Sequence, residues 1–260
     1  MNLSIVIPLL NEEESLKELF SRIDKVCVAN QLSYEIWFVD DGSTDKSWEI
    51  IEGFCRENDH IHGIKFSRNY GKSQALHAAF EKVSGDVVIT MDADLQDPPA
   101  LIPEMLQKWE AGADVVVGSR VKRSNDNFFK KAGAGFYYRV LDGLSGKLKL
   151  EKSAANFRLL SRKALHQVLA LPEVNTVFRV TVPFIGMKTD ILEYDRDKRY
   201  AGKTKYRLKN MIPYALDSIT GISVEPLRRI FITLPICGMF FILCMVAFFL
   251  AKGGWRHTAL

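Results

Sequence analysis

"GDVVITMDADLQDPP", residues 85–99, joins a strand-like apolar run to a cluster of acidic side chains. Residues 86–92 are almost all apolar, as expected of a central strand that is buried on both faces. If this strand continues through the acidic cluster, the side chains of Asp92 and Asp94 point to the same side. Two neighbouring carboxylates repel each other unless a cation lies between them or one of them is protonated. Asp97, which precedes two prolines, is expected only to end the strand and to start the next helix.

Strand-like runs alternate with helical patterns on both sides of this stretch. The expected strands are residues 3–8, 34–40, 61–66, 86–92, 114–120, 156–161 and 189–195. The expected helices are residues 11–28, 47–54, 73–83, 101–109, 128–144 and 162–169. Asn11 and Glu14 resemble a capping box for the first of these helices. The alternation implies right-handed βαβ units, and therefore an α/β, Rossmann-like fold with a mostly parallel sheet and helices on both faces.

Polar side chains follow each of the first five expected strands. In parallel α/β sheets, ligands bind beyond the carboxyl ends of the strands. These positions hold, in chain order, Pro8, Asn11, Glu12, Asp40, Asp41, Ser43, Ser67, Arg68, Asn69, Lys72, Asp92, Asp94, Gln96, Ser119 and Arg120. Because several polar loops converge on one end of the sheet, the sequence predicts a ligand site there.

Asp92 and Asp94 are the candidate metal ligands. Mg²⁺ prefers oxygen ligands and usually takes one or two carboxylates together with substrate phosphates. Gln96, two residues further on, can add a carbonyl oxygen. A helix cap and a turn are the alternative, but they account for Asp97 and not for the pair. The sequence therefore predicts a divalent cation at Asp92, Asp94 and Gln96.

Several other kinds of site are disfavoured. No G-x-G-x-x-G motif follows the first strand and no P-loop lysine motif is present, which removes support from dinucleotide oxidoreductases and ATPases. The four cysteines, Cys27, Cys55, Cys237 and Cys244, form no C-x-x-C pair. A zinc site or a disulfide framework is therefore not expected, and reduced thiols facing the cytosol fit better.

Residues 230–251 form an uncharged apolar segment that is long enough to cross the hydrocarbon core of a bilayer. A buried core helix is the alternative, but soluble helices of this length rarely lack polar positions. Arg228 and Arg229 precede the segment and indicate that the N-terminal domain faces the cytosol. Lys252 and Arg256, on the far side, weaken that orientation.

A basic run precedes the apolar segment. Residues 196–210 carry basic side chains against Asp197 alone, so they form a solvated helix face or bind anionic phosphate or lipid. Apolar residues recur at helical spacing over residues 204–219, which predicts an amphipathic helix at the membrane surface or, equally, a helix packed on the domain. The expected division of the chain is an α/β domain at 1–200, a basic loop and juxtamembrane helix at 201–229, a membrane helix at 230–251 and a tail at 252–260.

Seven motifs can be read along the chain. They are "SIVIPLLNEEESL" (4–16), "VDDGSTD" (39–45), "RNYGKSQAL" (68–76), "GDVVITMDADLQDPP" (85–99), "VGSR" (117–120), "NFRLLSR" (156–162) and "RYAGKTKY" (199–206). They occur in the order found in family 2 glycosyltransferases, and the chain most resembles the polyprenyl-phosphate (dolichol-phosphate mannosyltransferase-like) group of that family. "DADLQ" together with "AGKTKY" is specific to this group, whereas "DDGSTD" marks only the wider family. The resemblance, which covers nearly the whole chain, implies a GT-A fold and a requirement for Mg²⁺ or Mn²⁺. It also implies inverting transfer of a sugar from a nucleotide-sugar to a polyprenyl phosphate in a membrane.

The resemblance also sets expectations for partners and location. Bacterial-looking relatives favour a UDP-sugar as donor and undecaprenyl phosphate as acceptor, in the supply of sugar for cell-envelope polysaccharide. The protein is expected at the inner (cytoplasmic) membrane with its catalytic domain facing the cytosol. No nucleic-acid partner is expected, and a homo-oligomer assembled through the membrane-proximal region is left open.

The resemblance assigns roles to individual residues. A catalytic role is expected of Asp92, Asp94, Arg120 and Lys205. The metal and the donor diphosphate are expected to be held by Asp92, Asp94 and Gln96. Substrate binding is expected of Pro8, Asn11, Glu12, Asp40, Asp41, Lys72, Asn156, Arg158, Arg199 and Lys203. Asp40 is placed near the base, Arg120 near the acceptor or donor phosphate, and the basic residues of 199–205 near phosphates, to which lysine and arginine donate strong hydrogen bonds.

Two departures from the family pattern matter. Relatives commonly have an aspartate before "FRL", where this chain has Asn156, which cannot act as a base. A phosphate monoester has a second pKa of about 6 and is already a nucleophilic dianion at neutral pH, so no general base is obligatory. The alternative is that this branch is less active or uses another residue. Relatives in the bacterial group also often have two spanning helices, so the tail at 252–260 is read as a truncated second segment or a natural short form.

Two rival functions stay open. One is a membrane-anchored family 2 transferase that acts on a saccharide hydroxyl. Processive synthases of that type carry a Q-x-x-R-W motif, which this chain lacks, and a hydroxyl acceptor needs a base. The other is a non-catalytic protein that binds nucleotide-sugar or lipid, against which the intact Asp92, Asp94 and Arg120 argue.

Overall fold

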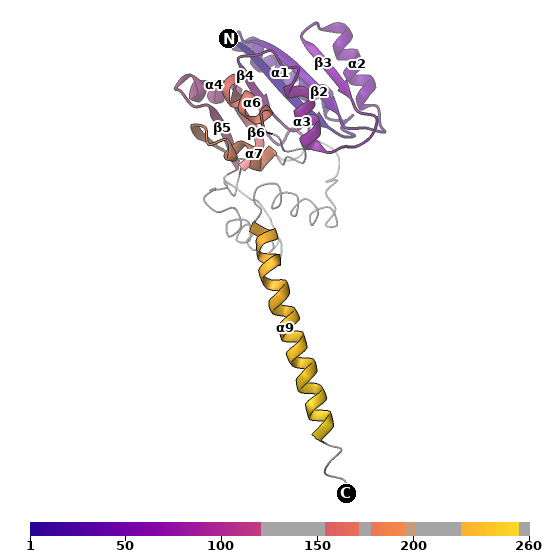
Figure 1. Ribbon diagram of the computed structural model, residues 1–260. Helices are drawn as coiled ribbons and strands as arrows, with labels where there is room; N and C mark the ends of the chain where they lie inside the picture. Colours follow the sequence, from indigo (N-terminus) through magenta and orange to yellow (C-terminus); the bar gives the residue numbers. More distant parts are fainter. Residues whose placement is uncertain (121–153, 172–177, 196, 198–199, 201–224, 255–260) are drawn as a thin grey trace.

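The computed structural model describes residues 1–120, 154–171, 178–195, 197, 200 and 225–254. Within this part of the chain, seven strands form one sheet in the order β3-β2-β1-β4-β6-β5-β7 (Figure 1). The strands are β1 (Asn2–Leu9), β2 (Ser33–Asp40), β3 (Ile61–Lys65), β4 (Val87–Thr90), β5 (Val115–Arg120), β6 (Ala154–Ser161) and β7 (Thr189–Tyr194). The helices are α1 (Leu16–Ala29), α2 (Ser47–Glu57), α3 (Lys72–Phe80), α4 (Ile102–Glu110), α6 (Arg162–Leu169), α7 (Phe178–Phe184) and α9 (Glu225–Gly254), with a short 3-10 helix η1 (Pro99–Leu101).

The strand directions give the sheet two chemically different ends. Paired strands run parallel except at β6, which is antiparallel to both β4 and β5. The last residues of the parallel strands therefore meet at one end, together with the first residues of β6. We call this the carboxyl end of the sheet and the opposite one the amino end. The mostly parallel sheet confirms the predicted fold class, and α7 is a helix that the sequence did not predict.

Helices cover both faces of the sheet because the strands are apolar on both faces. On β1, Ile5 and Ile7 point into a core shared with α1, α2 and α4. Val6, between them, points into a second core shared with α3, α6 and α7. Successive side chains of a strand face opposite sides of the sheet. A strand in which both sets of side chains are apolar therefore needs helices on both faces. This arrangement leaves the ends of the sheet as the places where polar loops gather.

The acidic stretch after β4 differs from its prediction. β4 ends at Thr90, so Asp92 and Asp94 lie in the following turn and not on the strand. Leu95, in the same turn, has a left-handed backbone with φ 58°. The expectation that strand periodicity puts the two carboxylates on the same side is therefore wrong. Both residues nevertheless lie in the loop at the carboxyl end, because that is where β4 ends.

The predicted capping box is also wrong. α1 begins at Leu16, and Asn11 has a left-handed backbone with φ 52°. The Oδ1 atom of Asn11 accepts a hydrogen bond from the amide of Thr44 (2.7 Å) and so serves the neighbouring loop. The helices predicted at 128–144 and 204–219 lie outside the described residues, and the predicted domain boundaries stay predictions.

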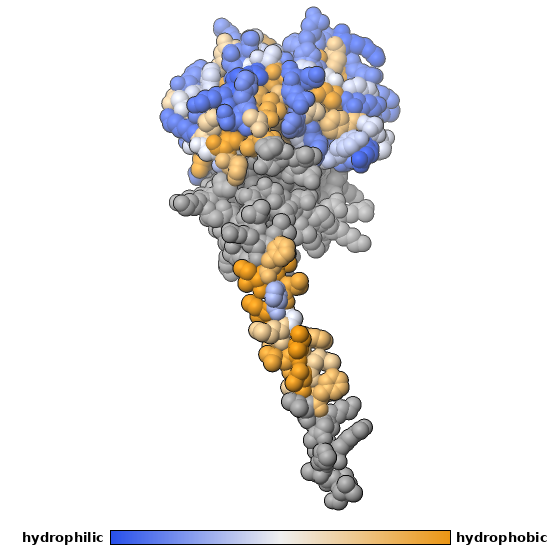
Figure 2. Space-filling view, viewed as in Figure 1, coloured by the Kyte–Doolittle hydropathy of each residue, from blue (hydrophilic) through white to orange (hydrophobic). Residues whose placement is uncertain are grey.

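α9 is the long apolar helix near the C-terminus. Residues Ile230–Phe249 have a mean hydropathy of 2.6, and none of their most apolar stretch is buried. Figure 1 shows α9 extending away from the sheet, and Figure 2 shows its largely hydrophobic surface. An exposed apolar surface of this length is stable in hydrocarbon and not in water, so the helix is long and apolar enough to cross a membrane.

Candidate active site

The loops that follow β1 and β2 are tied together by hydrogen bonds. The amide of Asn11 donates to Ser43 Oγ (2.8 Å), and Thr44 donates back to Asn11. The amide of Glu12 donates to Ser47 Oγ at the start of α2 (2.8 Å). The predicted substrate residues Asn11 and Glu12 therefore lie beside the loop after β2, and these contacts fix the two loops relative to each other.

Asp40 ends β2 as a fully buried carboxylate. Its Oδ1 atom accepts a hydrogen bond from the amide of Ser43 (2.8 Å). Its Oδ2 atom is buried too and has no hydrogen-bond donor among the described residues. A buried carboxylate oxygen without a donor is costly, so an N–H group of a ligand would stabilise this position. Pro8, the last but one residue of β1, is buried in the neighbouring strand and pairs with Val39.

Asp41 holds the loop that follows β3. Its carboxylate accepts hydrogen bonds from the amides of Tyr70 (2.7 Å) and Gly71 (2.9 Å). Burial outweighs these contacts and raises the pKa of Asp41. Gly42 has φ 80°, and a Cβ atom there would lie 2.6 Å from the carbonyl carbon of Arg68. The structure thus gives Asp41, predicted to bind substrate, a role in bracing two loops against each other.

Lys72 and Asp92 are brought together across the carboxyl end. Lys72 is the first residue of α3, and its ammonium group contacts the Asp92 carboxylate. Both side chains are partly exposed. The contact joins the loop after β4 to the start of α3.

Asp94 and Gln96 form the tight turn of the acidic loop. Oδ1 of Asp94 accepts from the amide of Gln96 (3.1 Å), and Asp94 is 8% exposed. The carbonyl of Gln96 accepts from the amide of Asp197 (3.2 Å), and the carbonyl of Asp94 accepts from that of Tyr200 (3.4 Å). Asp197 and Tyr200, which lie in the basic run at 196–210, are therefore hydrogen-bonded to the loop after β4 that carries the candidate metal ligands.

Asp97 and Tyr194 are site residues that the sequence reasoning missed. Asp97 is fully buried, and its Oδ1 atom accepts from Arg120 (2.9 Å) and from the hydroxyl of Tyr194. Burial and the negative charge of Asp92 raise the pKa of Asp97, against the opposing effect of Arg120. The expectation that Asp97 only ends a strand is therefore wrong. In β7, Leu192 and Tyr194 are two residues apart and both are buried. This strand alternation is the signal that could have indicated an inward-facing tyrosine.

The two predicted residues on β6 differ in position. Asn156 lies near the start of β6, half-buried between β4 and β5, and its carbonyl accepts from Thr90 Oγ1 (2.5 Å). Arg158, 1% exposed, donates to the carbonyl of Phe178 (3.3 Å) and lies over its ring. Asn156 is thus placed at the candidate site, whereas the contacts of Arg158 bind α7 to the sheet. Substrate binding by Arg158 stays a prediction.

Three predicted residues lie outside the described residues. They are Arg199, Lys203 and Lys205 of the basic run at 196–210.

The residues present fit a magnesium or manganese ion. Two carboxylates and an amide oxygen, from Asp92, Asp94 and Gln96, are hard oxygen donors in one short loop, and Mg²⁺ commonly completes such a set with phosphate and water. The contact between Lys72 and Asp92 shows the attraction of this loop for positive charge. Among the described residues, no cluster of three or more histidine, cysteine, aspartate or glutamate side chains forms a metal site built from protein alone. These three residues would hold an ion together with a phosphorylated substrate.

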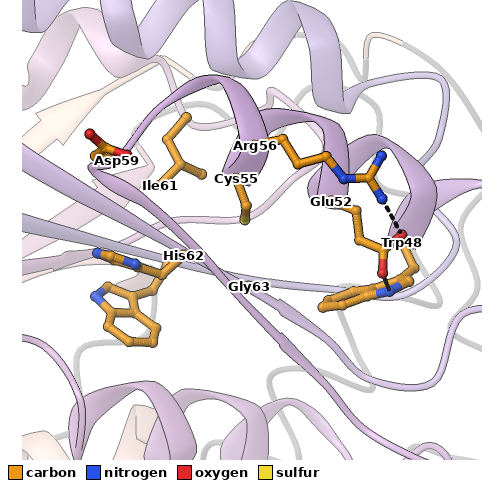
Figure 3. Close-up of a pocket in the computed structure, with 9 residues that line it drawn as sticks. Trp48, Glu52, Cys55, Arg56, Asp59, Ile61, His62 and Gly63 are labelled. Atoms are coloured by element: carbon orange, nitrogen blue, oxygen red, sulfur yellow. Dashed lines mark hydrogen bonds and ion pairs between the residues drawn. The ribbon is translucent and has the colours of Figure 1, made fainter.

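A cavity of about 590 Å³ lies elsewhere, along β3 and α2 (Figure 3). Its lining residues are Trp37, Trp48, Glu52, Cys55, Arg56, Asp59, Ile61, His62 and Gly63. Glu52 accepts from Trp48 Nε1 (2.8 Å) and pairs with Arg56, so these three polar side chains of the lining contact one another. The cavity contains none of the predicted site residues. We therefore place the candidate active site at the carboxyl end of the sheet, where charged side chains from several loops converge.

The chain is similar to known proteins over most of its length. The family described as "Glycosyl transferase family 2" matches residues 4–169, which include β1 to β6 and the acidic loop. The bactoprenol glucosyl transferase of Shigella phage SfV is 36% identical over 228 residues, covering 88% of this chain and 74% of that protein. An uncharacterized glycosyltransferase of Bacillus subtilis is 40% identical over 225 residues, covering 86% of this chain and 69% of the relative.

A solved structure shares the fold. Glucosyl-3-phosphoglycerate synthase from Mycobacterium tuberculosis, in complex with Mn²⁺, UDP and phosphoglyceric acid, superposes with a TM-score of 0.56 at 17% identity. The match covers 83% of this chain and 75% of the synthase. At this level of identity the likeness concerns the GT-A arrangement of strands and helices.

Proposed function

Because this chain belongs to glycosyltransferase family 2, we propose that it transfers a sugar from a nucleotide-sugar to a polyprenyl phosphate at a membrane surface. The observation that carries the proposal is the carboxyl end of the sheet. There, the loop after β4 holds its acidic side chains between Lys72 and Arg120. Relatives named bactoprenol glucosyl transferase, 36% identical over most of their length, support a lipid phosphate as acceptor.

The donor end of the site is assigned to the loops after β1 and β2. The buried Oδ2 atom of Asp40 would accept an N–H group of the nucleobase. The diphosphate would then lie near Asp92, Asp94 and Gln96, which follow β4, two strands along the sheet from β2. A divalent cation held by these three residues would neutralise the leaving nucleoside diphosphate. A glucosyl group is our preferred sugar, in keeping with the names of the relatives, and UDP is our preferred nucleotide.

The acceptor phosphate is the proposed nucleophile. One of its oxygens forms the new bond to the anomeric carbon, while the bond from that carbon to the diphosphate breaks and nucleoside diphosphate leaves. A phosphate dianion needs no general base, so Asn156 is compatible with this reaction, and positioning with charge neutralisation supplies the rate. Lysine and arginine side chains at the site, with those of 199–205, would hold the acceptor phosphate.

The membrane setting follows from α9. The apolar surface of Ile230–Phe249 supports association with the bilayer that contains the lipid acceptor. We propose that the sheet lies on the cytosolic side of the inner membrane, because Arg228, Arg229 and the run at 196–210 precede the helix. Assembly into a homo-oligomer through the membrane-proximal region is part of this proposal.

The test is transfer by the purified full chain in detergent. UDP-glucose, other UDP-sugars and GDP-mannose are offered with undecaprenyl phosphate in the presence of Mg²⁺ or Mn²⁺. We expect a glycosyl-phosphoryl lipid and one nucleoside diphosphate per sugar transferred, with no product after chelation of the metal. Undecaprenol, which lacks the phosphate, is the matched control and should accept nothing.

Two results would contradict the proposal. Transfer to a saccharide hydroxyl without transfer to the lipid phosphate would identify a different acceptor class. Binding of nucleotide-sugar without release of nucleoside diphosphate, for every lipid phosphate offered, would identify a binding protein.

A further inference from the structure

Asp97, Arg120 and Tyr194 form a network that draws three parts of the fold together. Arg120 ends β5 and Tyr194 ends β7, and the two residues are partners in the register of these parallel strands. Asp97 reaches them from the loop after β4, which is separated from β5 by β6. Asp97 is fully buried and Tyr194 nearly so, whereas the Arg120 side chain keeps 23% of its surface exposed.

The hydrogen bonds of the network fix the plane of the guanidinium group. A terminal nitrogen of Arg120 donates to Asp97 Oδ1 (2.9 Å), and Nε donates to the hydroxyl of Tyr194 (3.3 Å). The same hydroxyl donates to Asp97 Oδ1, so all three groups share a common contact. Two donors of one planar group, held on two different partners, leave the guanidinium with little rotational freedom. Its remaining donors are then held in fixed directions, and 23% of the side-chain surface stays exposed.

The position of Arg120 along the sheet indicates which phosphate it serves. The unsatisfied carboxylate oxygen of Asp40 lies at the end of β2, and the order of the strands runs from β2 through β1, β4 and β6 to β5. Strands are spaced by about 4.8 Å, so Arg120 is about four spacings, or roughly 19 Å, from β2. If the base of the nucleotide-sugar lies at β2 and its diphosphate at β4, its sugar lies towards β5, and so does the acceptor phosphate that attacks the sugar.

We propose that Asp97 and Tyr194 are positioning residues that orient Arg120 towards the phosphate of the lipid acceptor. This inference rests on the proposed function and deepens it, because it separates the acceptor side of the site from the donor side. Asp97 supplies the charge that makes an arginine stable at this half-buried position. Tyr194 supplies the direction, since its hydroxyl is held by Asp97 and in turn holds Nε.

The test compares Tyr194→Phe with the wild-type protein as full chains in the same detergent. The variant keeps the ring that packs against Phe157 and removes only the hydroxyl. We expect the KM for undecaprenyl phosphate to rise about tenfold, as for the loss of a hydrogen bond to a charged group. The KM for the nucleotide-sugar should stay within about twofold, because that substrate lies on the other side of the site.

A matched control and a second variant separate positioning from structure. Tyr34→Phe also removes a hydroxyl that donates to a carboxylate, Asp24 (2.7 Å), at a place remote from the carboxyl end, and both KM values should be unchanged. In an Arg120→Lys background, Tyr194→Phe should have no further effect on the acceptor KM, because the guanidinium that it orients is gone. A merely structural role would lower the melting temperature and the active fraction without changing the ratio of the two KM values.

The outcomes are distinguishable from failure of the proposed function. Absence of transfer to any lipid phosphate by the wild-type protein would overturn the function itself. An active wild-type protein whose Tyr194→Phe variant shows an unchanged acceptor KM, or an equal rise in both KM values, would overturn only the assignment of Asp97 and Tyr194. Asp97→Asn, if it folds, should raise the acceptor KM at least as much as Tyr194→Phe.

Discussion

The two ends of the sheet differ in whether their polar groups find hydrogen-bond partners. At the amino end, Oε1 of Glu35 accepts from the hydroxyl of Ser4 (2.6 Å) and from the amide of Ser84 (2.6 Å). The Ser4 hydroxyl in turn accepts from the amide of Gly85 (2.8 Å). Arg162 extends the same network by donating to the carbonyl of Val83 (3.0 Å). The polar groups at this end satisfy one another and join β1, β2 and β4.

At the carboxyl end, acceptors remain without donors. Among the described residues, two buried carboxylate oxygens lack a hydrogen-bond partner, Asp40 Oδ2 and Asp97 Oδ2, and both belong to this end. The acidic groups at the amino end stabilise the fold. Under the proposed function, those at the carboxyl end would meet a ligand that brings N–H groups and positive charge.

Asp94→Asn is the strongest test of this difference. The amide oxygen of asparagine can still accept from the Gln96 amide, so the loop should keep its shape, but the charge that binds a divalent cation is lost. We expect transfer to fall about 1000-fold with little change in melting temperature, since a metal ion contributes several kcal/mol to such reactions. Initial rates with UDP-sugar and undecaprenyl phosphate are the measurement.

Asp86→Asn is the matched control at the amino end. Asp86 accepts a hydrogen bond from the amide of Asn2 (2.9 Å), and its replacement should leave transfer unchanged. Equal rates for the two variants would show that the two ends do not differ in function and that Asp94 holds no metal.

Asp40→Asn should have a smaller effect, confined to the donor. The substitution is isosteric, and it turns an acceptor oxygen into either a weaker acceptor or an NH₂ group that faces the N–H group of the base. We expect the KM for the nucleotide-sugar to rise about tenfold or more, as for loss of a hydrogen bond to a charged group, with the acceptor KM unchanged. Steady-state kinetics with each substrate varied in turn measures both values.

Glu35→Gln, the same change of carboxylate to amide at the amino end, is the comparison for Asp40→Asn. It should leave both KM values at their wild-type level. A donor KM that is unaffected by Asp40→Asn would remove Asp40 from the nucleotide pocket and leave its buried oxygen without a proposed ligand.

The sequence predicted the sheet better than it predicted the site. Apolar strands such as 86–92 predict their own burial, and their alternation with helices predicts a parallel sheet, because both depend on local periodicity. The pairing of Lys72 with Asp92 also follows from topology, since α3 starts at the carboxyl end where β4 stops. Asp97 could not be assigned in this way. Its partners, Arg120 and Tyr194, are distant in the chain. The two prolines that follow Asp97 already accounted for it as a residue that ends a strand and starts a helix.

Local backbone geometry limited the prediction as well. Asn11 adopts a left-handed conformation and serves the loop after β2, which no helix-start signal reveals. β4 ends at Thr90, earlier than the apolar pattern of residues 86–92 suggests, and a turn with Leu95 in a left-handed conformation follows. Met91 is apolar and buried, so it resembles a strand residue although it lies outside the strand. The Asn11 conformation goes with a contact to another loop and the Leu95 conformation with a local turn, and helix or strand propensity reveals neither.

The smallest expected effect is on stability, at the amino end, and it depends on pH. Burial alone would raise the pKa of Glu35, but the hydrogen bonds from Ser4 and Ser84 outweigh it and lower the pKa below the ordinary value of 4.5. A carboxylate whose pKa is lower in the folded than in the unfolded protein stabilises the fold above the unfolded pKa, and this contribution is lost as pH falls through the folded pKa.

Glu35→Gln should therefore lower the free energy of unfolding by about 1 kcal/mol at pH 7, the usual net contribution of such hydrogen bonds. The difference from the wild-type protein should shrink as the pH falls from about 4.5 through the lowered pKa of Glu35, because the wild-type carboxyl group is then protonated as well. Unfolding of both full chains in detergent, measured at pH 7 and in steps down to acid pH, follows this difference. A gap that stays constant with pH would mean that Glu35 acts through its shape and not its charge. The amino end would then be stabilised by packing, and the contrast with the carboxyl end would lie in geometry alone.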